Sequence, residues 1–156
     1  MQGRWFDNFF SEGWRWALAD YKGNRFLNVN LSVPWPVSSR IIVINAENIS
    51  FHPDDINNFQ GFGNYFQAIE EIVIGKGTYI ACNVAIITAN HNFSKLEEHF
   101  KGQPVILGKE CWIGFNSVIL PGVVLGDRTI VGAGSIVTKS FPEGHCIIAG
   151  NPAKVI

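Results

Sequence analysis

The sequence predicts an all-β solenoid, a parallel β-helix in which the chain winds around a column of aliphatic side chains. Three observations carry this prediction: an aliphatic residue recurs every six positions, glycine follows five of nine such positions, and a small or β-branched residue stands four positions after most of them. A period of six fits neither the 3.6-residue period of a helix nor the two-residue period of a long strand. It fits short strands that turn a corner every six residues, with three sides to each turn and about 4.8 Å between turns. The aliphatic positions are Ile74, Ile80, Ile86, Leu107, Ile113, Ile119, Leu125, Val131 and Val137.

The chain has the length of one domain. Its 156 residues, 47% of them apolar, are enough for one packed core. We therefore expect a single unit. Its expected parts are an N-terminal cap and connector (1–40), irregular first coils (41–73), regular coils (74–139) interrupted by a loop (89–104), and a C-terminal segment (140–156).

Charge and cysteine content exclude several classes of protein. Twelve basic and 13 acidic residues give a net charge of -1, which argues against a nucleic-acid binder and against a basic membrane-surface protein. The three cysteines, Cys82, Cys111 and Cys146, form no CxxC pair, which indicates neither a disulfide framework nor a zinc site. No apolar run reaches the roughly 20 residues of a membrane span, and the first residues lack the features of a signal peptide. We expect a cytoplasmic protein without metal.

The N-terminal segment is rich in aromatic residues. Helical spacing places Phe6, Phe9, Phe10 and Ala17 on one face, which predicts a short helix that caps the open end of the column. An anchor at a membrane surface is the alternative. The stretch 22–40, which contains "VPWPVSS", is expected to be an extended connector.

The six-residue repeat breaks between Ile86 and Leu107. Leu107 stands 21 positions after Ile86, which is three sides of six plus three extra, so a loop of about 89–104 must leave the column. Long loops in compact domains are usually functional. His91 stands near the base of this loop, close to the rigid coil that ends at Thr88, which is a good place for a group that must keep its geometry.

The regular half of the chain resembles a known family. The stretches "IGKGTYIACNVAII" and "LGKECWIGFNSVILPGVVLGDRTIVGAGSIVTKSFPEGHCIIAGNPAKVI" resemble the hexapeptide-repeat acyltransferases over about residues 72–156. Within that family they look most like the sugar and polysaccharide O-acetyltransferases related to the galactoside and maltose enzymes. The resemblance implies a left-handed winding, a homotrimer with active sites between subunits, acetyl-coenzyme A as the acyl donor and a saccharide hydroxyl as the acceptor.

His91 is the candidate general base. Transfer of an acyl group from a thioester to a hydroxyl needs a base near neutral pH, and histidine is the side chain best suited to that task. No GxSxG motif is present, which favours direct transfer. The related enzymes carry "IAxNVxxxxxxH", and Ile80, Ala81, Asn83, Val84 and His91 match it.

Other positions in and near this motif leave alternatives open. Asn83 either contacts the acceptor or is a corner asparagine with a left-handed backbone. Asn92 stands where relatives often carry proline or aspartate, so the group that orients His91 is left open. Three further histidines are expected to be surface or turn residues, namely His52, His99 and His145.

The resemblance also implies how the donor is held. The backbone of Ala133 would contact the pantetheine arm, Thr138 and Lys139 would lie toward the phosphates, and Lys154 would add positive charge. A solvated surface charge is the alternative for each lysine. Trp112 would line the active site or pack at a subunit seam. Phe115 stands where relatives often carry a small residue that contacts the thiol end of the donor.

Several rival functions remain at this point. Metal-dependent carbonic anhydrases use the same repeat, but no two of the four histidines are five residues apart as that zinc site requires. A non-catalytic scaffold subunit of a glycan-synthesis assembly is a second alternative. Among acyltransferases, the acceptor could be a sugar hydroxyl, an amino sugar, serine or an antibiotic, and the acyl chain could be longer than acetyl.

Overall fold

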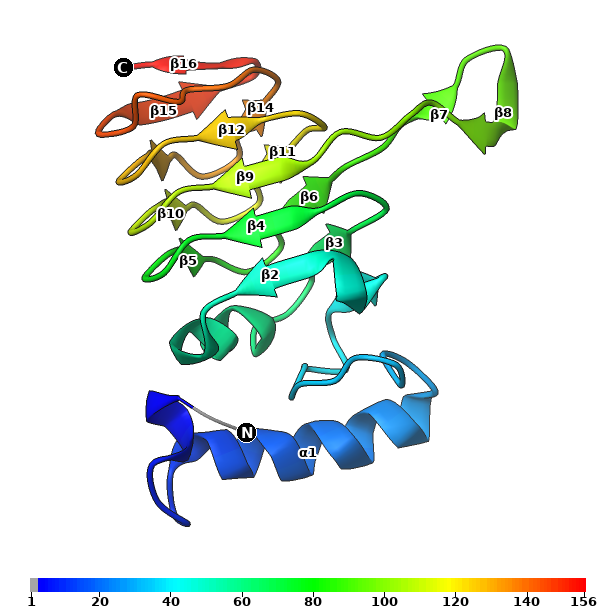
Figure 1. Cartoon of the computed structure of the whole chain (residues 1–156), viewed down its shortest axis with the longest axis vertical. Helices are drawn as coiled ribbons and strands as arrows, with labels where there is room; N and C mark the ends of the chain where they lie inside the picture. Colours follow the sequence, from blue (N-terminus) through cyan, green and yellow to red (C-terminus); the bar gives the residue numbers. More distant parts are fainter. Residues whose placement is uncertain (1–2) are drawn as a thin grey trace.

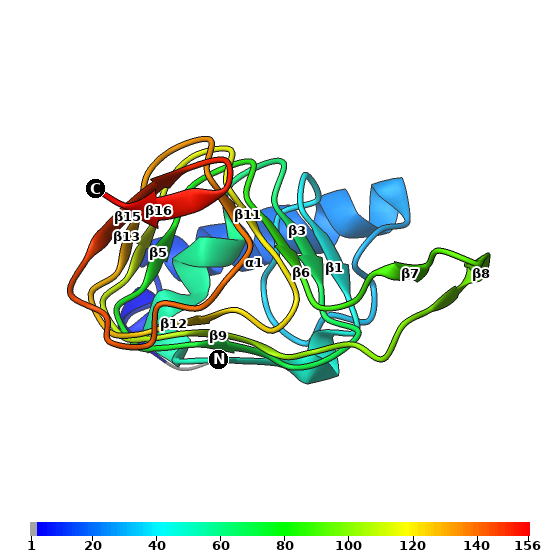
Figure 2. The same ribbon diagram turned by 90° about the horizontal axis from the view of Figure 1, so that it is seen from above.

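A computed structural model describes residues 3–156 of the chain. Figure 1 shows a column of stacked coils with a hairpin projecting from its side and a helix lying across its N-terminal end. Seen from above in Figure 2, the strands of successive coils overlie one another along three sides. The predicted all-β solenoid with one protruding loop is confirmed.

Three sheets form the sides of the column, and nearly all of their strands are parallel. Sheet A consists of β1 (Ile42–Ile44), β3 (Tyr65–Gln67), β6 (Ala85–Ile87), β11 (Val118–Ile119) and β14 (Ile136–Val137). Sheet B consists of β2 (Ile49–Phe51), β4 (Ile72–Ile74), β9 (Val105–Leu107) and β12 (Val124–Leu125). Sheet C consists of β5 (Tyr79–Ile80), β10 (Trp112–Ile113), β13 (Ile130–Val131), β15 (Ile147–Gly150) and β16 (Ala153–Val155).

The aliphatic residues of the repeat form the core. From β3 onward the chain visits sheets A, B and C in rotation, so each strand pairs with its equivalent in the next coil. In sheet A, Ile119 pairs with Ile86 on one side and Val137 on the other, and all three are fully buried. All nine predicted aliphatic positions are buried. The period of six therefore marks the inward-pointing residue of each side.

The corners explain the other two features of the repeat. A Cβ added to Gly108 would come within 2.6 Å of the backbone of the coil above, so only glycine fits where stacked corners approach so closely. The small residues four positions on are buried at the corners, and the hydroxyl groups among them satisfy backbone carbonyls. Thr78 Oγ1 donates to the Gly108 carbonyl at 2.6 Å, and Ser135 Oγ donates to the Gly132 carbonyl at 2.6 Å.

The first coils are irregular and contain two 3₁₀ helices, η2 (Ala46–Asn48) and η3 (Pro53–Phe59). The helix η3 lies beneath β5, where a regular coil would place a strand of sheet C. Its last residue, Phe59, is fully buried and its ring packs against those of Trp35, Phe51 and Phe66 at centroid distances of 4.8–5.3 Å. This aromatic cluster closes the N-terminal end of the column.

The N-terminal helix differs from the prediction. A 3₁₀ turn, η1 (Arg4–Phe6), precedes the α-helix α1 (Glu12–Leu27). Phe9 and Phe10 lie outside both helices and are 83% and 89% exposed, so the predicted apolar helical face is wrong. The helix begins only after Ser11, whose backbone is extended, and it continues into the predicted connector as far as Leu27, where the left-handed backbone of Asn28 ends it.

The helix α1 lies across the end of the column without filling it. Only Gly13 and Asn24 of α1 are buried. A few polar contacts hold the segment in place: Trp5 Nε1 donates to the Asp54 carbonyl at 2.7 Å, and Asn24 Nδ2 donates to the Val37 carbonyl at 2.8 Å. The predicted helical cap is confirmed, since α1 lies across the end of the column (Figure 1), but the Phe59 cluster and not an apolar face of α1 closes the core. None of the helices within residues 3–156 is both long and apolar enough to cross a bilayer.

The projecting hairpin consists of β7 (His91–Asn92) and β8 (Lys95–His99), which pair in antiparallel fashion. It leaves the column after β6 at the corner between sheets A and B. Its two ends meet again where the Gln103 N–H donates to the Thr88 carbonyl at 2.8 Å. The coil below and the coil above can therefore stack as if the insertion were absent.

The buried column predicts a clear difference between two isoleucines. Ile119→Ala removes a fully buried side chain and should lower the free energy of unfolding by about 2–5 kcal/mol. Ile106→Ala, on the outward side of β9 where the side chain is 37% exposed, should cost less than about 1 kcal/mol. Urea denaturation of both variants measures this, and equal losses would contradict the assignment of Ile119 to the core.

Candidate functional site

His91 is the first residue of β7, and its side chain is exposed at the base of the hairpin. Its Nδ1 lies 2.6 Å from the backbone carbonyl oxygen of Leu96. A carbonyl oxygen can only accept a hydrogen bond, so Nδ1 must carry the proton. In the neutral ring Nε2 then keeps its lone pair, which is the arrangement that a proton acceptor needs. The orienting group that the sequence left open is thus a backbone carbonyl.

His99 stacks on His91. The two residues are partners in the register of the hairpin, and their ring centroids are 4.2 Å apart with an angle of 32° between the planes. The sequence prediction of a mere surface or turn residue missed this contact. The pairing depends on the register of a hairpin with an irregularity between His91 and Asn92, which no local motif encodes. Two histidines eight residues apart in one long loop were the only available signal.

The root of the hairpin is fixed by Gln67, a residue that the sequence analysis did not single out. Its side-chain Oε1 accepts hydrogen bonds from the backbone N–H groups of Thr88 and Ala89 at 3.2 and 3.0 Å. The hydroxyl of Thr88, itself fully buried, donates to the Gln67 carbonyl at 2.6 Å. These bonds fix the backbone up to two residues before His91, so this histidine is attached to the rigid part of the molecule.

The outer part of the hairpin has contacts of its own. The rings of Phe93 and Phe100 pack edge to face with centroids 5.2 Å apart, and Lys95 Nζ lies 3.0 Å from Glu98 Oε1. Every residue of β8 is exposed. The hairpin therefore presents a largely free surface beyond His91.

Asn83 lies at a corner with a left-handed backbone, φ 59°. Its Nδ2 donates to Asn116 Oδ1 of the next coil at 2.6 Å, which forms a ladder of amide groups along the corner between sheets C and A. The structure thus fits the corner interpretation of this asparagine. Asn83 precedes β6 and His91 follows it, so the two residues lie at opposite ends of one side of the coil.

The predicted donor-binding residues are exposed but scattered over the column. Ala133 lies at the same corner as Asn83, and Thr138 and Lys139 follow β14 at the corner from which the hairpin leaves in a lower coil. Lys154 lies on β16, at the edge of sheet C. Trp112 projects from the middle of sheet C, where it is 56% exposed between Tyr79 and Ile130. A single chain therefore does not gather these groups around His91.

The corner at Ala133 has features that suit an amide-bearing ligand. Neither backbone group of Ala133 has a hydrogen-bond partner within residues 3–156. A Cβ added to the next residue, Gly134, would meet no atom within 4 Å, so the approach to this backbone is open. The nearby bulky side chain of Phe115 is 49% exposed at the preceding coil's corner.

Positive charge is available on the same half of the column. In the part of the chain that the structure describes, Lys139 and Lys154 have no carboxylate within ion-pair distance. Lys139 Nζ lies 5.6 Å from the ring centroid of Phe141. Both ammonium groups can therefore meet an anionic ligand.

Two further observations concern metals and thiols. Residues 3–156 contain no group of three or more histidine, cysteine, aspartate or glutamate side chains placed to hold a metal ion. The three cysteines are free, and burial raises the pKa of the Cys111 thiol.

Comparisons with known proteins agree with the repeat. Residues 104–139 match the family model described as the hexapeptide repeat of succinyl-transferase. A relative provisionally named as the lipopolysaccharide biosynthesis O-acetyl transferase WbbJ of Escherichia coli (strain K12) is 35% identical over 104 residues, 59% of this chain and 53% of that protein. The chain spans about half the length of this relative.

Solved structures show the same similarity. A maltose O-acetyltransferase from Clostridium difficile 630 is 38% identical with a TM-score of 0.56, over 60% of this chain and 51% of that one. A hexapeptide-repeat acetyltransferase from Vibrio cholerae, solved with acetyl-coenzyme A, is 27% identical with a TM-score of 0.56, over 61% and 53% of the two chains. The polysialic acid O-acetyltransferase OatWY is 32% identical with a TM-score of 0.50, over 60% and 46%.

The fold and the site define a class of protein, a left-handed parallel β-helix that carries an exposed histidine at the root of a side hairpin. Together with the matched repeat and these relatives, this makes the chain similar to the hexapeptide-repeat acyltransferases.

The geometry of His91 predicts its tautomer. Long-range ¹H–¹⁵N NMR spectra, recorded at a pH where imidazole is neutral, should show His91 protonated on Nδ1 because the Leu96 carbonyl accepts that proton. His145, which is also exposed, serves as the control. A His91 ring protonated on Nε2 would show that the contact with Leu96 does not form in solution.

Proposed function

We propose that the protein is an acetyl-coenzyme A-dependent O-acetyltransferase that transfers an acetyl group to a hydroxyl of a saccharide. The observation that carries the proposal is the oriented imidazole of His91, with Nδ1 bonded to the Leu96 carbonyl and Nε2 free at an exposed surface. The named activities of the relatives support the same class of reaction.

His91 acts as the general base in the proposed mechanism. Its Nε2 takes the proton of the acceptor hydroxyl as that oxygen attacks, and the stacked ring of His99 and the Leu96 carbonyl hold the imidazole in place. When bound, acetyl-coenzyme A supplies the acetyl group as a thioester. His91 then returns the proton to the departing thiolate, so the base is restored at the end of each cycle. No nucleophilic residue of the chain is needed for this direct transfer.

The upper corner of the column suits the donor. The free backbone groups of Ala133, beside the open position at Gly134, match the amides of a pantetheine arm. Thr138 and Lys139 at the adjacent corner, with Lys154 at the edge of sheet C, offer a hydroxyl and two positive charges to phosphate groups. The structure of the Vibrio cholerae relative with acetyl-coenzyme A supports this choice of donor.

We further propose that the enzyme is a homotrimer with its active sites between subunits. Ala133 and Lys154 lie at another corner and another sheet of the chain than His91, and Thr138 and Lys139 share its corner only two coils higher, so a neighbouring copy would complete the site. The exposed Trp112 in the middle of sheet C would line the seam, and Asn83 would contact the acceptor from its corner. The hairpin is long enough to reach across to a neighbour while its root stays fixed.

The acceptor is proposed to be a saccharide of a capsule, lipopolysaccharide or exopolysaccharide precursor. Relatives named for maltose, polysialic acid and lipopolysaccharide support this class. An amine acceptor and a non-catalytic scaffold remain as outcomes of the tests below. We also propose a cytoplasmic location, which three unpaired cysteines favour.

Replacing the base tests the proposal. His91→Ala should lower the rate of thiol release from acetyl-coenzyme A by about 10² to 10⁴, measured across a panel of mono-, oligo- and nucleotide sugars. Donor binding should be unchanged, because His91 does not hold the donor. His145→Ala is the control and should keep full activity. Equal rates for the wild type and His91→Ala on every acceptor would refute the general base, and absence of donor binding would favour the scaffold.

The stacked histidines predict a second kinetic effect. His99→Ala removes the ring that packs on His91 and should lower kcat by about tenfold with little change in KM, because only the orientation of the base is lost. His99→Phe keeps an aromatic ring at this position and should retain most of the rate. If the two variants are equally impaired, stacking is not the role of His99.

A further inference from the structure

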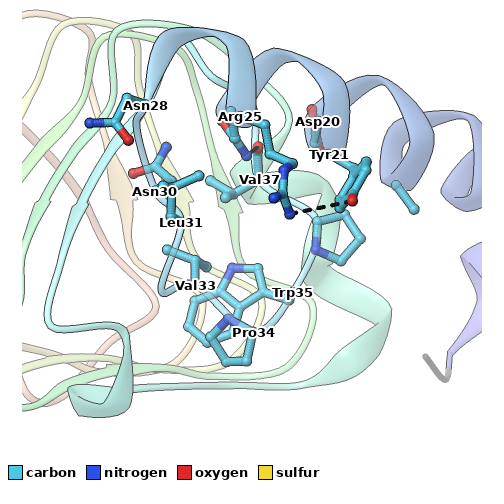
Figure 3. Close-up of a pocket in the computed structure, with 13 residues that line it drawn as sticks. Asp20, Tyr21, Arg25, Asn28, Asn30, Leu31, Val33, Pro34, Trp35 and Val37 are labelled. Carbon is cyan, nitrogen blue, oxygen red and sulfur yellow. Dashed lines mark hydrogen bonds between the residues drawn. The ribbon is translucent and has the colours of Figure 1, made fainter.

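A cavity of about 520 Å³ lies between α1 and the connector that follows it. Figure 3 shows its lining: the side of α1 that carries Asp20, Tyr21 and Arg25, and the facing segment that carries Val33 to Val37. The cavity exists because α1 spans the end of the column without packing onto it, while the Phe59 cluster closes the column above. Its volume is in the range of small-molecule sites in proteins.

Three residues in the wall of the cavity each carry a buried polar atom that lacks a partner. Four buried side-chain polar atoms within residues 3–156 make no hydrogen bond, and three of them belong to residues that line the cavity: Asp20 Oδ2, Asn24 Oδ1 and Trp35 Nε1. Asn24 is only 8% exposed. Buried polar groups in native proteins are nearly always hydrogen-bonded, so a cluster of unpaired ones beside a cavity indicates a missing partner.

These three atoms specify what the partner must offer. The oxygens of Asp20 and Asn24 accept hydrogen bonds and need donors, whereas the indole N–H of Trp35 needs an acceptor. Burial raises the pKa of the Asp20 carboxyl, and a hydrogen bond from the Gln60 side chain opposes this only in part, while Oδ2 is left without a partner. A phosphate group at neutral pH offers mainly acceptors, and a hydrocarbon offers neither. A hydroxyl group both donates and accepts.

The rest of the lining is mixed, with apolar and aromatic side chains beside Arg25, Asn28 and Asn30. Trp35 packs on Phe51 and Phe59 at one side and faces the cavity at another, so its ring is held rigidly. Tyr21 lies across the cavity mouth, where Arg25 Nη1 donates to its hydroxyl at 3.3 Å, as the dashed line in Figure 3 shows. Flat apolar surfaces beside planar polar side chains match a ring that carries C–H groups on its faces and hydroxyls on its rim.

We propose that this cavity binds one neutral sugar ring, at a place separate from the acetyl-transfer site. The sugar hydroxyls would supply the hydrogen bonds that Asp20, Asn24 and Trp35 lack, while its C–H face packs against the aromatic rings. β1, which follows the connector, and β6, from which the hairpin leaves, are two strands apart in sheet A, roughly 10 Å along the column. Sugar binding in this cavity does not depend on acetyl transfer. The purpose we assign to the cavity, which is to hold one sugar unit of an acceptor glycan while another unit is acetylated, rests on the proposed function.

Sugar binding to the full chain, measured by titration calorimetry and saturation-transfer NMR without acetyl-coenzyme A, tests the proposal. The probes are glucose, galactose, N-acetylglucosamine, maltose and lactose, with inorganic phosphate as the contrasting anion. At least one sugar should bind with a Kd of about 10 mM or tighter. Tyr21→Ala and Asp20→Asn should each weaken that binding by about tenfold. Tyr21 is 61% exposed, so its replacement should leave the fold intact.

Two controls locate the binding. Lys22→Ala changes an exposed residue of the same helix that does not line the cavity, and His91→Ala changes the hairpin, so neither should alter sugar binding. The proposal is overturned if no probe sugar binds, if only phosphate binds, or if binding survives Tyr21→Ala and Asp20→Asn but is lost in His91→Ala. Because acetyl transfer is not measured, a Tyr21-dependent sugar complex without transferase activity would reject the proposed function and keep this site.

Discussion

The structure depends on the stacking of one aliphatic side chain per side, coil upon coil. Ile86, Ile119 and Val137 illustrate it: each is fully buried and lies directly beside its equivalent in the neighbouring coil. The backbone hydrogen bonds between these paired strands set the spacing of the coils, and that spacing determines which residues fit at the corners. Where stacked backbones come closest only glycine fits, as at Gly108, and where a corner carbonyl turns inward a threonine or serine hydroxyl must bond it, as at Thr78.

A rigid column permits a long insertion, because the insertion begins and ends at one corner. Gln67 and Thr88 fix the point of departure, and the bond from Gln103 to Thr88 closes the loop before β9 resumes the coil. His91 follows this anchored stretch by only three residues, whereas the exposed β8 strand has little contact with the column. One short segment thus combines a fixed position for His91 with few contacts to the column for the outer part of the hairpin.

The sequence predicts well those parts of the molecule in which each residue packs on the equivalent residue of the next coil, because such contacts recur at a fixed interval along the chain. The buried aliphatics, the glycine corners and the protruding loop are of this kind. Contacts made between distant or irregular segments were missed: the stacking of His99 on His91 depends on hairpin register, and the support from Gln67 reaches across to the following coil. The aromatic N-terminus misled the helix prediction, because Phe9 and Phe10 fall in a turn and pack mainly on each other.

The strand β16 has a consequence for the behaviour of the molecule in concentrated solution. It turns back and pairs in antiparallel fashion with β15, so the uppermost parallel strand of sheet C is occupied by the chain itself. An uncovered parallel edge would be a template on which a second column could continue the winding end to end. Because β16 runs in the opposite direction, it covers this parallel edge on one of the three sides of the column. End-to-end association of columns into a filament is therefore less favourable at this end.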